Sequence, residues 1–190
     1  TLTQLAETRD HESEGHMNRV GFFSAMIARQ MNLDEKFCQD LEIFAPMHDI
    51  GKVGIPDGIL HVPRELCREE FQVIKMHTQI GWQILKDKQT FEFAANIAYT
   101  HHEHWDGTGY PRHLKGENIP LAGRICAVAD CYDSLRSVRS YRNKASHDQV
   151  MNWIKLSSGT LFDPNVVTAT CAIESQLKEL FDRTYTIDVE

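Results

Sequence analysis

Apolar residues recur every three or four positions along almost the whole chain, and no stretch alternates apolar and polar residues for the length of a β-strand. Val20, Ile27 and Met31 mark one face of a first helix. Asp34 is placed to cap a second helix, which should end near Gly51. Further helices are predicted over residues 71–85, 91–98, 120–135 and 146–156, and from residue 164 onward. The sequence therefore predicts an all-α fold, a single compact bundle of about seven helices.

Length and charge restrict the class of protein further. The 190 residues suffice for one domain with a hydrophobic core and are few for two. The chain begins at Thr1 without a signal-like segment, so we expect a fragment of a longer protein. No apolar run approaches the roughly 18 residues of a membrane span. The net charge of −7 argues against a nucleic acid polymer or an anionic membrane as a partner.

The five cysteines are odd in number and form no CxxC pair. A disulfide framework would favour an even number of cysteines, and a zinc ribbon would require CxxC pairs. Reduced thiols are typical of an intracellular protein, so we expect a cytoplasmic location.

Histidine and acidic residues fall on the apolar faces of the predicted helices. His48 follows Leu41 by seven residues and is followed directly by Asp49, and His77 follows Ile74 by three. The positions of this kind are Glu12, His16, His48, Asp49, His77, His101, His102 and Asp130. A single histidine there would usually be a core residue bonded to a carbonyl. Burying so many ionisable groups costs roughly several kcal/mol each without compensation, so the sequence predicts a buried multinuclear metal site.

Four segments carry a family pattern: HDIGKVGIPD at residues 48–57, HHEHWDGTGYP at 101–111, IPLAGRICAVADCYDSL at 119–135 and GTLFDP at 159–164. Together they strongly resemble the HD-GYP domain, the bacterial branch of the HD-domain phosphohydrolases that hydrolyses cyclic dinucleotides. The resemblance covers nearly the whole chain. It implies that residues 1–190 are one phosphodiesterase domain, and that a receiver or sensory domain precedes it in the longer bacterial protein.

The resemblance also assigns roles to residues. The eight positions given above would hold two or three divalent metal ions, iron first, with manganese or nickel as alternatives. Asp49 would bridge two ions. From its position one turn beyond His48, Lys52 would stabilise charge on the phosphate, and from its position three residues after Asp130, Asp133 would orient a ligand or Lys52. The plainer interpretations are a solvated lysine at a helix end and a surface aspartate on a helix.

By the same resemblance Tyr110, Arg139 and Arg142 would contact the substrate. Asp10 is a candidate for reading a guanine edge, with a cap at a helix terminus as the plainer interpretation. Residues 139–142 read Arg-Ser-Tyr-Arg where the family usually has Arg-Pro-Tyr-Lys, which loosens the backbone and replaces a point charge with a planar fork. The Gly-Tyr-Pro turn at residues 109–111 should present Tyr110 outward, to the substrate or to a GGDEF-domain cyclase. Packing of this turn against its own domain is the alternative.

The implied function is hydrolysis of cyclic di-GMP to linear pGpG, and on to GMP, which lowers the level of a bacterial second messenger. A close variant is a preference for 3'3'-cyclic GMP-AMP. The alternative from another class is a catalytically weak signalling module that contacts GGDEF-type partners. A third reading, an HD-type hydrolase of other nucleotides, is disfavoured by the Gly-Tyr-Pro turn. The oligomeric state stays open, with a homodimer as one option.

Overall fold

The structure, a computed structural model, describes residues 15–62, 64–137 and 145–187. Within these ranges the chain forms nine α-helices, four short 3₁₀ helices and no β-strand. The prediction of an all-α fold is confirmed, although the bundle has more helices than the seven or so expected. No helix in the described ranges has the length and hydropathy that crossing a lipid bilayer requires.

The α-helices are α2 (His16–Gln30), α3 (Glu35–Phe44), α4 (Asp57–Leu60), α5 (Arg68–Leu85), α6 (Glu92–Thr100), α7 (Leu121–Arg136), α8 (His147–Leu156), α9 (Pro164–Ala172) and α10 (Glu174–Ile187). The 3₁₀ helices are η1 (Ala45–Met47), η2 (Ile50–Gly54), η3 (Gln89–Phe91) and η4 (Gly116–Asn118).

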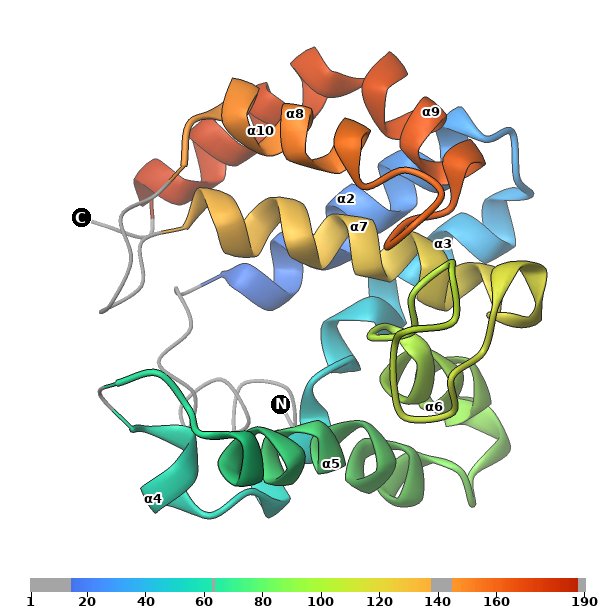
Figure 1. The fold of residues 1–190 in the computed structure, drawn as a ribbon. Coiled ribbons are helices and arrows are strands. Elements are labelled where there is room, and N and C mark those ends of the chain that lie inside the picture. Colours follow the sequence, from blue (N-terminus) through green and yellow to red (C-terminus); the bar gives the residue numbers. More distant parts are fainter. Residues whose placement is uncertain (1–14, 63, 138–144, 188–190) are drawn as a thin grey trace.

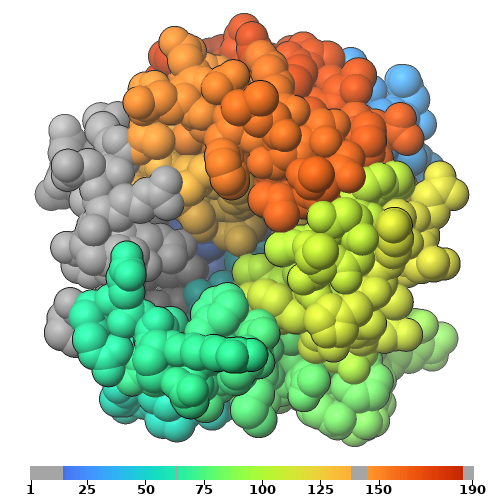
Figure 2. Space-filling view, viewed as in Figure 1, coloured from blue at the N-terminus to red at the C-terminus, as the bar shows by residue number. Residues whose placement is uncertain are grey.

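Helices α2 and α7 pack against each other at the centre of the bundle (Figure 1). Helices α8, α9 and α10 cover one side of this pair, and α5 and α6 lie on the other side (Figure 1). The larger core cluster lies between the central pair and its covering helices and includes Val20, Phe23, Ile125, Tyr132 and Ile154. A smaller cluster, which includes Met17, Ile50, Ala94 and Ala98, lies toward α5 and α6. The surface is hollowed between these two sides of the bundle (Figure 2).

The second predicted helix is shorter than expected. Asp34 caps it as predicted, because its side chain accepts a hydrogen bond from the backbone N–H of Phe37 at 2.9 Å. The helix ends at Phe44, however, so the prediction that it continues to about Gly51 was wrong. Pro46 lacks a backbone N–H, so it cannot donate the hydrogen bond to the carbonyl of Glu42 that would continue the α-helix. The chain therefore continues in the 3₁₀ helices η1 and η2, and residues 48–49 lie in the turn between them.

Gly51, which follows this turn, and Gly81 of α5 allow the two segments to approach each other closely. A Cβ atom on Gly51 would lie 1.9 Å from the carbonyl oxygen of His77 and 2.4 Å from the backbone nitrogen of Gly81. Both neighbours are main-chain atoms of a helix, which cannot move aside as a flexible side chain could. The missing side chain at Gly51 therefore sets the distance between the turn that carries Asp49 and the helix that carries His77.

Replacing Gly51 with alanine should lower the free energy of unfolding by about 3 kcal/mol, the upper end of the range for overpacked sites. Urea denaturation followed by circular dichroism measures this change. Gly58→Ala is the matched control, because no atom lies within 4 Å of its added Cβ and Gly58 lies in the short helix α4. Equal stability of the two variants would contradict the role given to Gly51.

Candidate metal centre

Two groups of ligand-type side chains meet at the centre of the bundle. The first is Asp49, His77, His101 and His102, and the second is His16, His48 and Asp130. In each group the nearest side-chain nitrogen and oxygen atoms lie within 4.8 Å of one another. Seven of the eight predicted ligands are therefore brought together, from α2, the 48–49 turn, α5, the end of α6 and α7. The eighth, Glu12, lies outside the described residues.

Asp49 joins the two groups. One carboxylate oxygen, Oδ1, lies 3.1 Å from Nε2 of His77, and the other, Oδ2, lies 3.3 Å from Nε2 of His48. Each oxygen thus faces a different group, which is the arrangement that a bridging carboxylate requires. The prediction that His48 and Asp49 share a helix was wrong, and it is the turn between η1 and η2 that aims both side chains inward.

Backbone carbonyls fix the orientation of three of the histidines. The Nδ1–H groups donate to carbonyl oxygens in the pairs His48 with Ala45 at 2.9 Å, His77 with Ile74 at 2.7 Å and His101 with Ile97 at 3.1 Å. A carbonyl oxygen can only accept, so the proton of each neutral imidazole is on Nδ1 and the lone pair is on Nε2. This is how outer hydrogen bonds prepare histidine for metal binding.

The lone pairs meet without a proton between them. Nε2 of His77 and Nε2 of His101 lie 3.3 Å apart. Nε2 of His48 and Oδ1 of Asp49 are buried and have no hydrogen-bond partner among the described residues. Buried acceptors that face one another are costly unless a cation lies among them. Imidazole nitrogens and carboxylate oxygens suit several divalent transition metals, so the donor set fits a site for such ions.

The electrostatics keep Asp49, His101 and His102 in the forms that bind a metal ion, whereas His48 differs. Burial, together with the neighbouring imidazoles, lowers the pKa of His101 and holds that of His102 well below its ordinary value, so both rings are neutral. Burial disfavours the charged form of Asp49, but Lys52 and His48 outweigh it and hold the pKa of that carboxyl well below its ordinary value. Burial also disfavours a charged His48, yet Asp49 raises its pKa, so a proton competes with a metal ion there.

Lys52 and Asp133 support the cluster from two sides. Nζ of Lys52 lies 2.7 Å from Oδ2 of Asp49, and its side chain is only 15% exposed, so it is not a solvated lysine at a helix end. Asp133 is fully buried, so the reading as a surface aspartate was wrong. Its Oδ2 accepts a hydrogen bond from Nδ1 of His16 at 2.6 Å. The sequence analysis gave Asp133 two possible roles, to orient a metal ligand or to orient Lys52. The hydrogen bond to His16 favours the first.

Arg19 was not singled out from the sequence. It is 1% exposed, and its guanidinium donates to both oxygens of Asp133, from Nε at 2.6 Å and from a terminal nitrogen at 3.2 Å. Burial alone would raise the pKa of Asp133, but His16 and Arg19 hold it below its ordinary value. A signal was available, because Arg19 follows His16 by three residues on a face shared with Val20 and Phe23.

The Gly-Tyr-Pro turn packs inward against the cluster. The ring of Tyr110 stacks on His102, with centroids 4.8 Å apart, and its backbone N–H donates to the carbonyl of His102 at 3.0 Å. Glu103, which the sequence analysis overlooked, is buried and accepts hydrogen bonds from the backbone N–H groups of Arg112 and Leu114. The ring of Tyr110 thus covers His102 and does not point freely outward.

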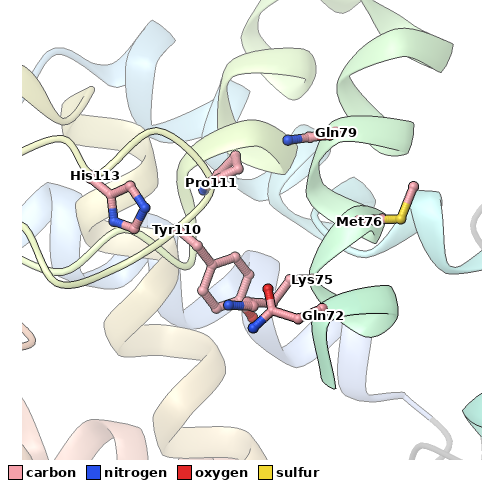
Figure 3. A pocket seen from close by; sticks show the side chains of 7 residues that line it. All are labelled: Gln72, Lys75, Met76, Gln79, Tyr110, Pro111 and His113. Carbon is pink, nitrogen blue, oxygen red and sulfur yellow. The ribbon is translucent and has the colours of Figure 1, made fainter. Parts of the chain in front are cut away.

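The outer side of this turn borders an open pocket of about 240 Å³ (Figure 3). Lys75 of α5 lies over the ring of Tyr110, with Nζ 5.4 Å from the centroid. The predicted substrate residues Asp10, Arg139 and Arg142 lie outside the described residues, so their placement stays a prediction.

A helical bundle with a His-Asp pair at the centre of a histidine cluster defines the class of HD-domain proteins. The HD domain family model matches residues 1–166, and the chain belongs to this family. Its sequence motifs resemble those of the HD-GYP branch, and the curated relatives given below are named as cyclic dinucleotide phosphodiesterases.

A cyclic di-GMP phosphodiesterase of Thermotoga maritima is 44% identical over 184 residues, which cover 96% of this chain and 50% of the relative. The 3'3'-cGAMP-specific phosphodiesterase 2 of Vibrio cholerae is 37% identical over 168 residues, covering 87% of this chain and 32% of that protein. The chain thus spans half or less of the length of these relatives. The phosphodiesterase PgpH HD domain of L. monocytogenes, solved with cyclic-di-AMP, shares the fold, with a TM-score of 0.67, 15% identity and coverage of 95% and 96%.

Proposed function

We propose that this chain is a metal-dependent phosphodiesterase that opens cyclic di-GMP to linear pGpG, with further cleavage to GMP as an open alternative. The observation that carries the proposal is the joined pair of ligand groups around Asp49, in which the Nε2 atoms of His77 and His101 face each other at 3.3 Å. The relatives support the substrate class, since their names divide between cyclic di-GMP and 3'3'-cGAMP. The mixed dinucleotide is therefore the close alternative substrate.

The cofactor that fits this donor set is two or three divalent ions, iron first, with manganese or nickel as alternatives. His77, His101 and His102 would hold one ion, His16, His48 and Asp130 another, and Asp49 would be shared. A third ion would need Glu12. When bound, such ions lower the pKa of a water molecule toward neutrality and accept phosphate oxygens.

The remaining residues of the site would act on the substrate. Lys52 carries its positive charge beside Asp49, where a phosphate oxygen would gain charge during cleavage, so it would stabilise that charge. Tyr110 would contribute its exposed edge to binding while its ring face covers His102. Arg139 and Arg142 would bind the second phosphate or a base.

We also infer a bacterial cytoplasmic location and a partner surface. An odd number of cysteines without a CxxC pair suits a reducing compartment. A GGDEF-domain partner would contact the outer side of the Gly-Tyr-Pro turn, where Phe71 and Met76 are 45% and 49% exposed. A receiver or sensory domain before residue 1 stays a prediction, compatible with relatives of twice this length.

Product chromatography tests the proposed activity. The chain, loaded anaerobically with Fe(II) or with Mn(II), is incubated with cyclic di-GMP, 3'3'-cyclic GMP-AMP and cyclic di-AMP. We expect a linear dinucleotide or a mononucleotide from at least one of the first two, and the ratio of rates ranks the substrates. No product from any of the three, with two or more metal ions bound, would contradict the proposal and favour the signalling module.

A further inference from the structure

We propose that Arg19 is a positioning residue for His16, that it acts through Asp133, and that helix α10 holds it in place. The inference rests on the proposed metal centre, of which His16 is one ligand. Neither Arg19 nor α10 contacts the reacting atoms in this assignment. Their effect is on the direction in which one imidazole points.

Hydrogen bonds link Arg19 to His16 through a carboxylate of the neighbouring helix α7. Arg19 of α2 donates two hydrogen bonds to the Asp133 carboxylate of α7, one to each oxygen. The same carboxylate accepts the Nδ1–H of His16, which directs Nε2 of that ring toward Asp130, with Oδ1 at 3.5 Å. The three residues joined by these hydrogen bonds, His16, Arg19 and Asp133, are at most 1% exposed.

Two aromatic residues of α10 lie against the buried guanidinium. Phe181 and Tyr185 stack on each other, with centroids 5.0 Å apart and planes inclined by 14°. The Cζ atom of Arg19 lies 5.5 Å from the centroid of Phe181 and 5.6 Å from that of Tyr185. Cation–π contacts are strongest where water is excluded, as it is around this side chain. Helix α10 lies beyond residues 1–166, the part of the chain that the family model matches.

A guanidinium suits this role and an ammonium does not. The planar fork of arginine holds both carboxylate oxygens at once and lies flat against aromatic rings. A lysine would keep the charge but would bind one oxygen as a point charge, so the carboxylate could rotate about its bond to Cβ. Because Asp133 sets the direction of His16, rotation would misplace Nε2 relative to His48 and Asp130.

The effect should therefore be confined to one ligand group. His16 belongs to the group with His48 and Asp130, whereas Asp49, His77, His101 and His102 receive their orientation from other contacts. A general loss of stability would instead weaken both groups together. This difference separates positioning from a merely structural role.

The test is a Mn(II) titration of the chain without substrate, with free Mn(II) measured by its electron paramagnetic resonance signal. In Arg19→Lys we expect one bound ion to lose ten- to a hundredfold in affinity, the range for loss of an outer-shell contact. The other ion should keep its affinity within about twofold. Asp130→Asn, which removes a ligand from the same group, should weaken the same ion and spare the other.

Arg124→Lys is the matched control, because Arg124 pairs with buried Asp163 at 2.6 Å, away from the metal ligands. It should leave the affinity of both ions unchanged. Phe181→Leu is a milder second variant, which retains apolar packing and removes the ring under Arg19. It should weaken the same ion as Arg19→Lys, by a smaller factor.

Unchanged affinities in both Arg19→Lys and Phe181→Leu would overturn the inference, as would an equal loss for both ions. If the unsubstituted chain bound no Mn(II), the proposed metal centre itself would fail. If the chain binds two or more ions but hydrolyses no cyclic dinucleotide, the proposed activity fails and the inference about Arg19 stands.

Discussion

Asp49→Asn will lose at least about 10³-fold in phosphodiester hydrolysis, or ~4 kcal/mol of transition-state stabilisation, together with its bound metal. The physical reason is that Asp49 faces both ligand groups, one oxygen toward His77 and the other toward His48. An amide has one carbonyl oxygen and no negative charge, so it can serve only one group. Its NH₂ would also point donor hydrogens at a cation.

The measurement pairs turnover of cyclic di-GMP with metal content by mass spectrometry on the same sample. Asp87→Asn is a matched control, since this aspartate is exposed in the loop after α5 and should change neither quantity. Full activity of Asp49→Asn at an unchanged metal content would show that the centre lies elsewhere.

Asp133→Leu will lower the free energy of unfolding by about 3–5 kcal/mol, even in a chelator that removes all metal. Leucine is similar in size but leaves the buried guanidinium of Arg19 without the carboxylate that accepts two of its hydrogen bonds. Urea denaturation in the presence of EDTA measures the change and keeps it separate from any effect of metal binding.

A second substitution tests this explanation. Adding Arg19→Met to Asp133→Leu removes the unpaired charge, and replacing both partners of a buried pair with apolar residues is often close to neutral. The double variant should therefore regain most of the lost stability, although its metal affinity stays low. A double variant no more stable than Asp133→Leu would contradict the assignment of the loss to Arg19.

Local signals in the sequence were sufficient for much of the fold. The Asp34 cap, and helices close to 120–135 and 146–156, follow from side chains within a few residues of one another, and these predictions are confirmed. The apolar faces on which His77 and Asp130 lie also indicated that each side chain points to the cluster, where the two belong to different ligand groups. Beyond Phe44 the apolar residues keep the helical spacing, but the backbone leaves the α-helical conformation near Pro46. The sequence analysis therefore missed the turn at residues 48–49.

The residues that the sequence analysis overlooked depend on contacts across long separations. Arg19 pairs with Asp133, which lies 114 residues away in the sequence. The face that Arg19 shares with Val20 and Phe23 hints at its burial, but its partner becomes apparent only once α2 and α7 are packed together. Glu103 is similar, because its partners are backbone N–H groups of a loop whose shape no short pattern specifies.

The proposed metal ligands come from five segments spread between His16 and Asp130, and metal binding across these segments would tie folding to metal supply. Ions that bind only the native arrangement shift the folding equilibrium by mass action, by about 2.7 kcal/mol for each site at a free concentration a hundred times its dissociation constant. Starvation for the ion would then reduce the amount of folded chain as well as its turnover. A cell short of this metal would clear its messenger more slowly for two reasons at once, and proteolysis of the unfolded fraction would delay recovery when the metal returns.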